Sequence, residues 1–112
     1  MPHQLERIAR RAALGMARTG ATSGNGSGDI FLAFSTDNRR TSVNPDVAHV
    51  EMLSNNRISA LFSATVQATE EAIINGLVAA ETMTGADDRT IEAIPHDRLR
   101  ELLVKYGRAR TP

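Results

Sequence analysis

The hydrophobic and polar positions of this chain follow two kinds of pattern. In three stretches the apolar side chains recur every three or four residues, which is the periodicity of a helix that buries one face. These stretches predict helices over residues 3–18, 56–82 and 97–106. The middle helix carries few charged residues, so we expect it to be largely buried.

Residues beside these helices supply their expected caps. Gly20 follows the first helix and Gly107 follows the last, and glycine is favoured there because it adopts a positive φ without strain. Asn55 or Asn56 is placed to cap the middle helix, since an Asn side chain accepts a hydrogen bond from the free N–H groups of a first turn.

Three further stretches predict strands. Residues 29–36 are apolar at consecutive positions, so a strand there needs cover on both faces. Residues 47–53 and 90–94 alternate as half-buried strands do, and a polar segment with an Asn44-Pro45 turn precedes the first of them. The order of elements indicates an α/β or α+β layered fold. Three strands protect such a sheet poorly, which suggests that the complete folded unit is larger than this chain.

Composition excludes several classes of function. Of the 112 residues, 41% are hydrophobic and 23% charged, which is typical of one globular domain or part of one. Thirteen basic and thirteen acidic residues cancel, so no net charge attracts nucleic acid or an anionic membrane. Cysteine is absent, which excludes thiolate metal sites and a cysteine nucleophile.

The sequence also predicts no metal, no other cofactor and no membrane segment. The three histidines, His3, His49 and His96, do not have the spacing of metal ligands. The apolar runs are far shorter than the roughly 20 residues that span a bilayer, and no export signal is visible. A cytoplasmic location is therefore expected.

The glycine-rich loop at residues 20–28 holds the candidate chemistry. Its glycines lack the spacing of a dinucleotide-binding loop, and it follows a helix rather than preceding one, unlike a phosphate site. Asn25 and Asp29 stand where a hydrolase nucleophile elbow needs glycines around Ser27, so that motif is excluded. Two interpretations stay open, namely a flexible loop with an Asn-Gly turn and a self-processed nucleophile.

The Gly26–Ser27 bond has the residue types that self-cleavage needs. The Ser27 hydroxyl can attack the Gly26 carbonyl in an N-to-O acyl shift, and glycine leaves that carbonyl unhindered and tolerates a strained backbone. Hydrolysis of the resulting ester frees Ser27 as a new N-terminus. Its α-amino group can then serve as the general base for its own hydroxyl.

Several specific runs extend through almost the whole chain, including Asn25-Gly26-Ser27-Gly28-Asp29-Ile30 and Glu81-Thr82-Met83-Thr84-Gly85. The runs as a set are residues 9–15, 18–20, 23–36, 69–75, 80–85 and 94–95. By these runs the chain resembles the C-terminal part of the β-aminopeptidase family, which includes the L-aminopeptidase/D-Ala-esterase-amidase enzymes.

The resemblance implies an architecture and an activity. Members of the family are made as much longer precursors that cleave themselves before a serine, giving a long α-chain and a short β-chain. Their fold is a four-layer αββα sandwich, of which this chain is the C-terminal portion. Carried over, residues 1–26 form the helix and glycine-rich loop before the cleavage site, and residues 27–112 form the β-chain-like segment. The implied activity is removal of the N-terminal residue of small peptides, amides or esters through an acyl-enzyme.

The resemblance also implies the catalytic residues Ser27, Thr69 and Glu71, with self-cleavage between Gly26 and Ser27. The family often has Ser in place of Thr69, and Glu71 is expected to hold or orient the new amine. Glu70 is the competing carboxylate, about 100° away around the helix. From the residues alone, Thr69 can instead bond its own backbone, and Glu71 can be an ordinary surface or ion-paired residue.

The implied partners are a small peptide or amide substrate, the missing α-chain-like N-terminal part and, in the complete protein, further copies in a homo-oligomer. Neither nucleic acid nor a membrane is expected. The family's oxyanion-stabilising and substrate-pocket residues lie mostly in the N-terminal part. The alternative function is therefore a truncated or split, non-catalytic fragment that needs this part for activity.

Overall fold

The computed structural model describes residues 1–38 and 46–110 and divides into two compact units, Met1–Glu71 and Ala72–Pro112. The described residues form three α-helices, two short 3-10 helices and one two-stranded antiparallel sheet. The expected mixture of helices and strands is confirmed at this level. No helix in the described ranges is long and apolar enough to cross a membrane. The predicted Asn44-Pro45 turn lies outside the described residues.

The first predicted helix is confirmed as α1, Pro2–Arg18. Its C-terminus has the geometry that the sequence predicts. The N–H groups of Gly20 and Ala21 donate to the carbonyls of Ala17 and Met16, and Gly20 has a φ of 96°. This is a Schellman motif, which glycine allows because it has no β-carbon to clash at positive φ.

The second helix, α2, covers Ser59–Ala79 and is shorter than predicted. A 3-10 helix, Asn55–Arg57, precedes it, and the Ser54 hydroxyl caps that helix by accepting from the Asn56 N–H at 3.4 Å. The prediction of an Asn cap is therefore wrong, because the Asn55 side chain accepts a hydrogen bond from Gln4 instead.

The prediction that the middle helix is largely buried is also wrong. No residue of α2 is buried, whereas Ile58, directly before it, is only 2% exposed. Leu61 and Leu77 keep 44% and 55% of their surface exposed. Burial of an apolar helix requires a second layer of structure over it, and the described residues do not supply that layer along the whole helix.

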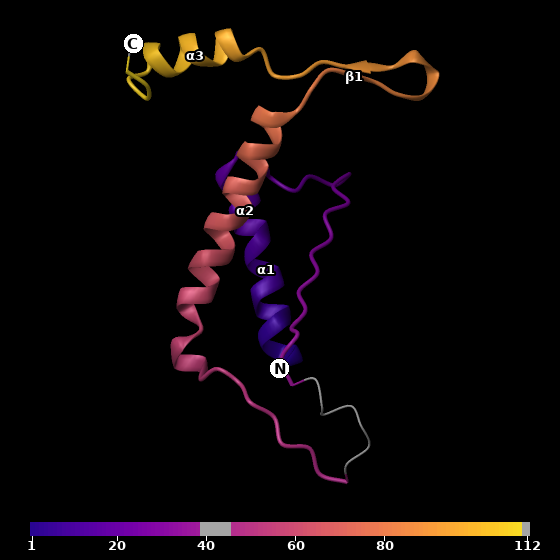
Figure 1. Cartoon of the computed structure of the whole chain (residues 1–112), viewed down its shortest axis with the longest axis vertical. Helices are drawn as coiled ribbons and strands as arrows, with labels where there is room; N and C mark the ends of the chain where they lie inside the picture. Colours follow the sequence, from indigo (N-terminus) through magenta and orange to yellow (C-terminus); the bar gives the residue numbers. More distant parts are fainter. Residues whose placement is uncertain (39–45, 111–112) are drawn as a thin grey trace. The chain divides into compact units, whose positions relative to one another are not determined.

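Within the first unit, α1 and α2 lie side by side and share a partly polar contact (Figure 1). The guanidinium carbons of Arg7 and Arg11 lie 5.1 and 3.9 Å from the ring centroid of Phe62. Gln4 is buried and donates to the Leu53 carbonyl at 2.7 Å. Each cation–π contact is worth about 0.5–1 kcal/mol at an exposed site. The polar face of α1 therefore contributes to packing within the first unit.

The two helices pack closely against each other at Gly15, which is buried. A β-carbon at this position would lie 2.6 Å from the Val66 carbonyl oxygen and 2.6 Å from the Thr69 β-carbon. Neither atom belongs to a flexible side-chain end that can move aside easily. Glycine is therefore required at position 15 to let α1 and α2 pack at this spacing.

We expect Gly15→Ala to lower the free energy of unfolding by about 1–3 kcal/mol, because the added methyl group must push the helices apart. The matched control is Gly76→Ala in α2, where an added β-carbon meets nothing within 4 Å. That control should be neutral, or stabilising by up to about 1 kcal/mol, since alanine favours helix more than glycine does. Urea unfolding of both variants makes the comparison, and equal stability of the two would contradict this account of the packing.

The predicted strands at 29–36 and 47–53 are wrong for the described residues, since neither range forms a strand. A strand requires a hydrogen-bonded neighbour, and the described residues offer none to either range. Near the ends of these two ranges, a side chain of the first segment instead bonds the backbone of the second. Asn38 accepts from the Glu51 N–H at 2.8 Å and donates to the Glu51 carbonyl at 2.9 Å.

The segment after the glycine-rich loop nevertheless follows the course of α1 (Figure 1). Phe31, Leu32 and Ala33 line a hollow of about 310 Å³ together with Leu5 and Ala9 of α1. The alternate side chains are almost bare, with exposed fractions of 91% for Ile30, 87% for Leu32 and 77% for Phe34. Phe31 and Ala33 are partly covered and their neighbours are exposed, so exposure alternates along this segment as it does along a strand with one uncovered face.

The second unit contains a short hairpin. Strand β1, Met83–Thr84, pairs antiparallel with β2, Thr90–Ile91, in the register Met83↔Ile91 and Thr84↔Thr90. The 3-10 helix Ala86–Asp88 connects them. The predicted strand at 90–94 is therefore confirmed only in its first two residues.

The last predicted helix is confirmed as α3, His96–Lys105, in the second unit. Its end is a second Schellman motif, in which Gly107 has a φ of 65° and the Arg108 N–H donates to the Leu103 carbonyl at 2.7 Å. The glycine signals therefore predict both helix ends correctly.

Candidate functional site

Ser27 lies in an exposed turn of the glycine-rich loop. Its N–H donates to the Gly24 carbonyl at 2.8 Å, which closes a four-residue turn through Asn25 and Gly26. The predicted Asn-Gly turn is therefore present. The Gly26–Ser27 peptide bond is itself part of the turn, so its orientation is held by that hydrogen bond.

Within the described ranges, the acidic side chain in contact with the Ser27 hydroxyl is that of Asp29. The Ser27 hydroxyl donates a hydrogen bond to a carboxylate oxygen of Asp29, and the Ser23 hydroxyl donates to the same oxygen at 3.4 Å. Sequence reasoning did not assign Asp29 a role. The available signal was its spacing, because short polar side chains two residues apart in a loop commonly bond each other or the backbone.

Thr69 lies on α2 in the contact with α1. It is half-buried against Gly15, and its hydroxyl donates to the Thr65 carbonyl at 2.8 Å. The structure therefore shows the bonding expected when a helical threonine satisfies its own backbone. In this arrangement the Thr69 hydroxyl has no bond to Ser27.

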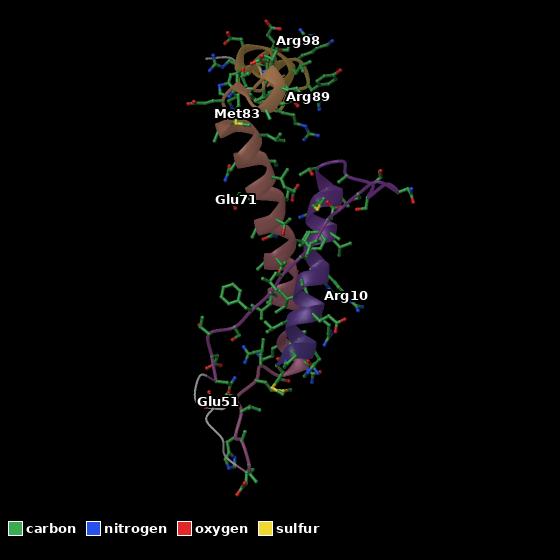
Figure 2. The ribbon with its side chains drawn as sticks, turned by 90° about the vertical axis from the view of Figure 1, so that its right-hand side faces the viewer. Arg10, Glu51, Glu71, Met83, Arg89 and Arg98 are labelled. Carbon is green, nitrogen blue, oxygen red and sulfur yellow. The ribbon has the colours of Figure 1, made fainter. Side chains whose placement is uncertain are left out.

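The two neighbouring glutamates differ in their partners. Glu70 forms an ion pair with Arg18 of α1 at 2.9 Å, with 33% of the Glu70 side chain exposed. Glu71 is exposed and has no hydrogen bond or ion pair with the described residues. Figure 2 shows Glu71 on the side of α2 away from α1. At about 100° per residue, Glu71 is half a turn from Phe62, which faces α1.

The three predicted catalytic residues, Ser27, Thr69 and Glu71, share no hydrogen bond within the described residues. Positions two apart on a helix point about 200° away from each other, so Thr69 and Glu71 face different directions. The part of the chain that the structure describes also contains no group of three or more His, Asp or Glu residues that could hold a metal ion.

Comparison with known proteins places these residues in a family context. The model of peptidase family S58 matches residues 1–91, a range that includes Ser27, Asp29, Thr69 and Glu71. Beta-peptidyl aminopeptidase BapA of Sphingosinicella microcystinivorans is 53% identical over 109 residues, covering 96% of this chain and 28% of that protein. The protein of the same name from Sphingosinicella xenopeptidilytica is 50% identical over 92% of this chain and 26% of its own length. The chain thus spans only about a quarter of these relatives.

A solved structure gives the same picture. The L-aminopeptidase D-Ala-esterase/amidase of Ochrobactrum anthropi, a prototype for the serine aminopeptidases with a new variant of the Ntn hydrolase fold, matches with a TM-score of 0.86. It is 44% identical, and the match covers 98% of this chain and 31% of that one. The order of helices and loops described above is therefore part of a larger fold in that protein.

Proposed function

The chain belongs to peptidase family S58, and from this premise we propose that it supplies the nucleophile-bearing part of a serine aminopeptidase. The proposed reaction removes the N-terminal residue of small peptides, amides or esters. The observation that carries the proposal is the position of Ser27, which lies within the family match and in an exposed turn directly after a glycine. The hydroxyl of such a serine can reach the carbonyl of the preceding peptide bond, and it can also reach the carbonyl of a bound substrate.

The proposed chemistry has two stages. In the first, the Ser27 oxygen attacks the Gly26 carbonyl carbon, the C–N bond breaks as the nitrogen takes up a proton, and water hydrolyses the ester that forms. In the second, the freed α-amino group accepts the Ser27 hydroxyl proton as the oxygen attacks the substrate carbonyl. The leaving amine or alcohol takes up that proton, and water then releases the acyl group from Ser27.

Glu71 and Thr69 have supporting roles in the proposal. The Glu71 carboxylate is unpaired within the described residues, so it is available to hold the positive charge of an amine. The Thr69 hydroxyl must leave the Thr65 carbonyl to take part, which a threonine in a helix can do by changing between its two common rotamers. The upstream α-chain-like part completes the site and the proposed four-layer αββα sandwich, where it covers the bare face of Ile30, Leu32 and Phe34.

A second candidate is a fragment that has no activity by itself. Two observations favour it. The chain spans about a quarter of its relatives, and no hydrogen bond joins Ser27 to Thr69 or Glu71 within the described residues. The two candidates differ in whether this chain cleaves itself and turns over substrate without the N-terminal part of its relatives. The experiment must therefore compare the chain alone with the chain in a complete protein.

The test uses a grafted protein, defined as the S. microcystinivorans relative with its matching segment replaced by this chain. Intact-mass measurement should show cleavage between Gly26 and Ser27, and the cleaved protein should hydrolyse an aminoacyl p-nitroanilide. The chain alone is measured in parallel. Activity in the graft but not in the chain alone supports the second candidate, and activity in both supports the first. An uncleaved and inactive graft contradicts the proposed function.

A further inference from the structure

Self-cleavage needs a base that the mature enzyme does not. In the mature form the free α-amino group of Ser27 can accept the hydroxyl proton. Before cleavage that nitrogen belongs to the Gly26–Ser27 peptide bond, and an amide nitrogen is not a useful base. Some other group must therefore take the proton in the first reaction.

The candidates for this base are few within the described residues. Thr69 donates its hydroxyl to the Thr65 carbonyl and has no contact with Ser27. Glu71 has no hydrogen bond with Ser27, and Glu70 is paired with Arg18. The Asp29 carboxylate is the group that accepts the Ser27 hydroxyl hydrogen.

The geometry around Asp29 suits proton transfer. The Ser27 N–H bond to Gly24 holds the turn, so the hydroxyl and the preceding carbonyl stay on one short segment. The Ser23 hydroxyl donates to the same Asp29 oxygen at 3.4 Å, which helps to keep the carboxylate next to Ser27. No cation forms an ion pair with Asp29 within the described residues, so its lone pairs are not committed to a salt bridge.

We propose that Asp29 is the catalytic base of self-cleavage and not of substrate turnover, an inference that rests on the proposed function. Asp29 takes the hydroxyl proton while the Ser27 oxygen bonds to the Gly26 carbonyl carbon. It returns the proton to the Ser27 nitrogen as the C–N bond breaks, which leaves an ester and a free amine. Water then hydrolyses the ester, giving the Gly26 carboxylate and the Ser27 hydroxyl. After that, the amine is present and Asp29 is no longer needed as the base.

The first experiment measures the rate of self-cleavage in the grafted protein by intact mass. General-base catalysis contributes about 10²–10⁴-fold, so Asp29→Asn should slow cleavage at least about 100-fold, and Asp29→Glu should restore part of the rate. Asp87→Asn, which removes the same charge from the hairpin loop of the second unit, is the matched control and should cleave at the unmodified rate.

The second experiment bypasses self-cleavage. Residues 27–112, made as a separate chain with Ser27 at its N-terminus, are co-expressed with the remainder of the grafted protein. In this assembly Asp29→Asn should keep kcat within a few-fold of the unmodified protein. A comparable loss of turnover would overturn the division of roles, and rapid cleavage of Asp29→Asn in the first experiment would overturn the base assignment.

Failure of the inference about Asp29 can be told apart from failure of the proposed function. If Ser27→Ala blocks cleavage while Asp29→Asn does not, the nucleophile stands and the inference about Asp29 fails. If the unmodified graft neither cleaves nor turns over substrate, the proposed function and the inference fail together.

Discussion

Ser27→Ala in the grafted protein is expected to leave the chain uncut and to lower kcat/KM for an aminoacyl p-nitroanilide by about 10³-fold or more. The physical reason is the same for both reactions. Alanine has no oxygen to form the ester with Gly26, and it has none to form the acyl-enzyme. One substitution should therefore abolish two separate activities, which are self-cleavage, measured by intact mass, and substrate turnover.

The matched control for this prediction is Ser23→Ala. Ser23 lies in the same loop, and its hydroxyl donates to the same Asp29 oxygen, but it has no place in the proposed bond-making steps. We expect Ser23→Ala to cleave and turn over substrate within about ten-fold of the unmodified graft, since it loses only one long hydrogen bond. Turnover that survives Ser27→Ala would exclude Ser27 as the nucleophile.

Helix ends were predictable from sequence because local chemistry determines them. Gly20 and Gly107 each adopt a positive φ and complete a Schellman motif, and neither needs a distant partner. The cap of the 3-10 helix before α2 was not predictable in the same way. Ser and Asn are both good caps, and in the structure Ser54 caps this helix while the Asn55 side chain accepts a hydrogen bond from Gln4, a residue far away along the chain.

Strands and burial were predicted less well because they depend on neighbours. Ile30, Leu32 and Phe34 have the pattern of a strand face, yet they are exposed, and no strand pairs with them in the described residues. The apolar pattern of 29–36 is that of a strand covered on both faces, and the described residues do not provide that cover. The same reasoning explains why α2 is apolar in sequence but not buried.

In the candidate site, too, features set by local sequence were predictable, and features that depend on tertiary contacts were not. Ser27 was predictable because the Gly-Ser dipeptide and its chemistry are local. The pairing of Glu70 with Arg18 was not, since these residues meet only when α1 packs on α2. Asp29 was visible in the sequence, but its role depends on a hydrogen bond that only the turn geometry shows.

Glu71→Gln is expected to lower kcat/KM in the grafted protein by about 10²-fold. Glutamine keeps the size of the side chain and removes its negative charge, so the amine at Ser27 or on the substrate loses its proposed counter-charge. The measurement is kcat and KM for the same p-nitroanilide, after intact mass has confirmed that the protein is cleaved. Normal cleavage with reduced turnover would place Glu71 in the mature site.

Glu70→Gln is the matched control, because it makes the same chemical change one residue away. Its carboxylate is already paired with Arg18 at 2.9 Å, so its removal should cost stability rather than chemistry. The pair is partly exposed, and a pair of this kind contributes about 0–1 kcal/mol. We therefore expect Glu70→Gln to change kcat/KM by less than about five-fold and to lower the unfolding midpoint slightly. The reverse result, with Glu70→Gln inactive and Glu71→Gln active, would move the catalytic carboxylate to Glu70 and require the ion pair with Arg18 to open in the complete enzyme.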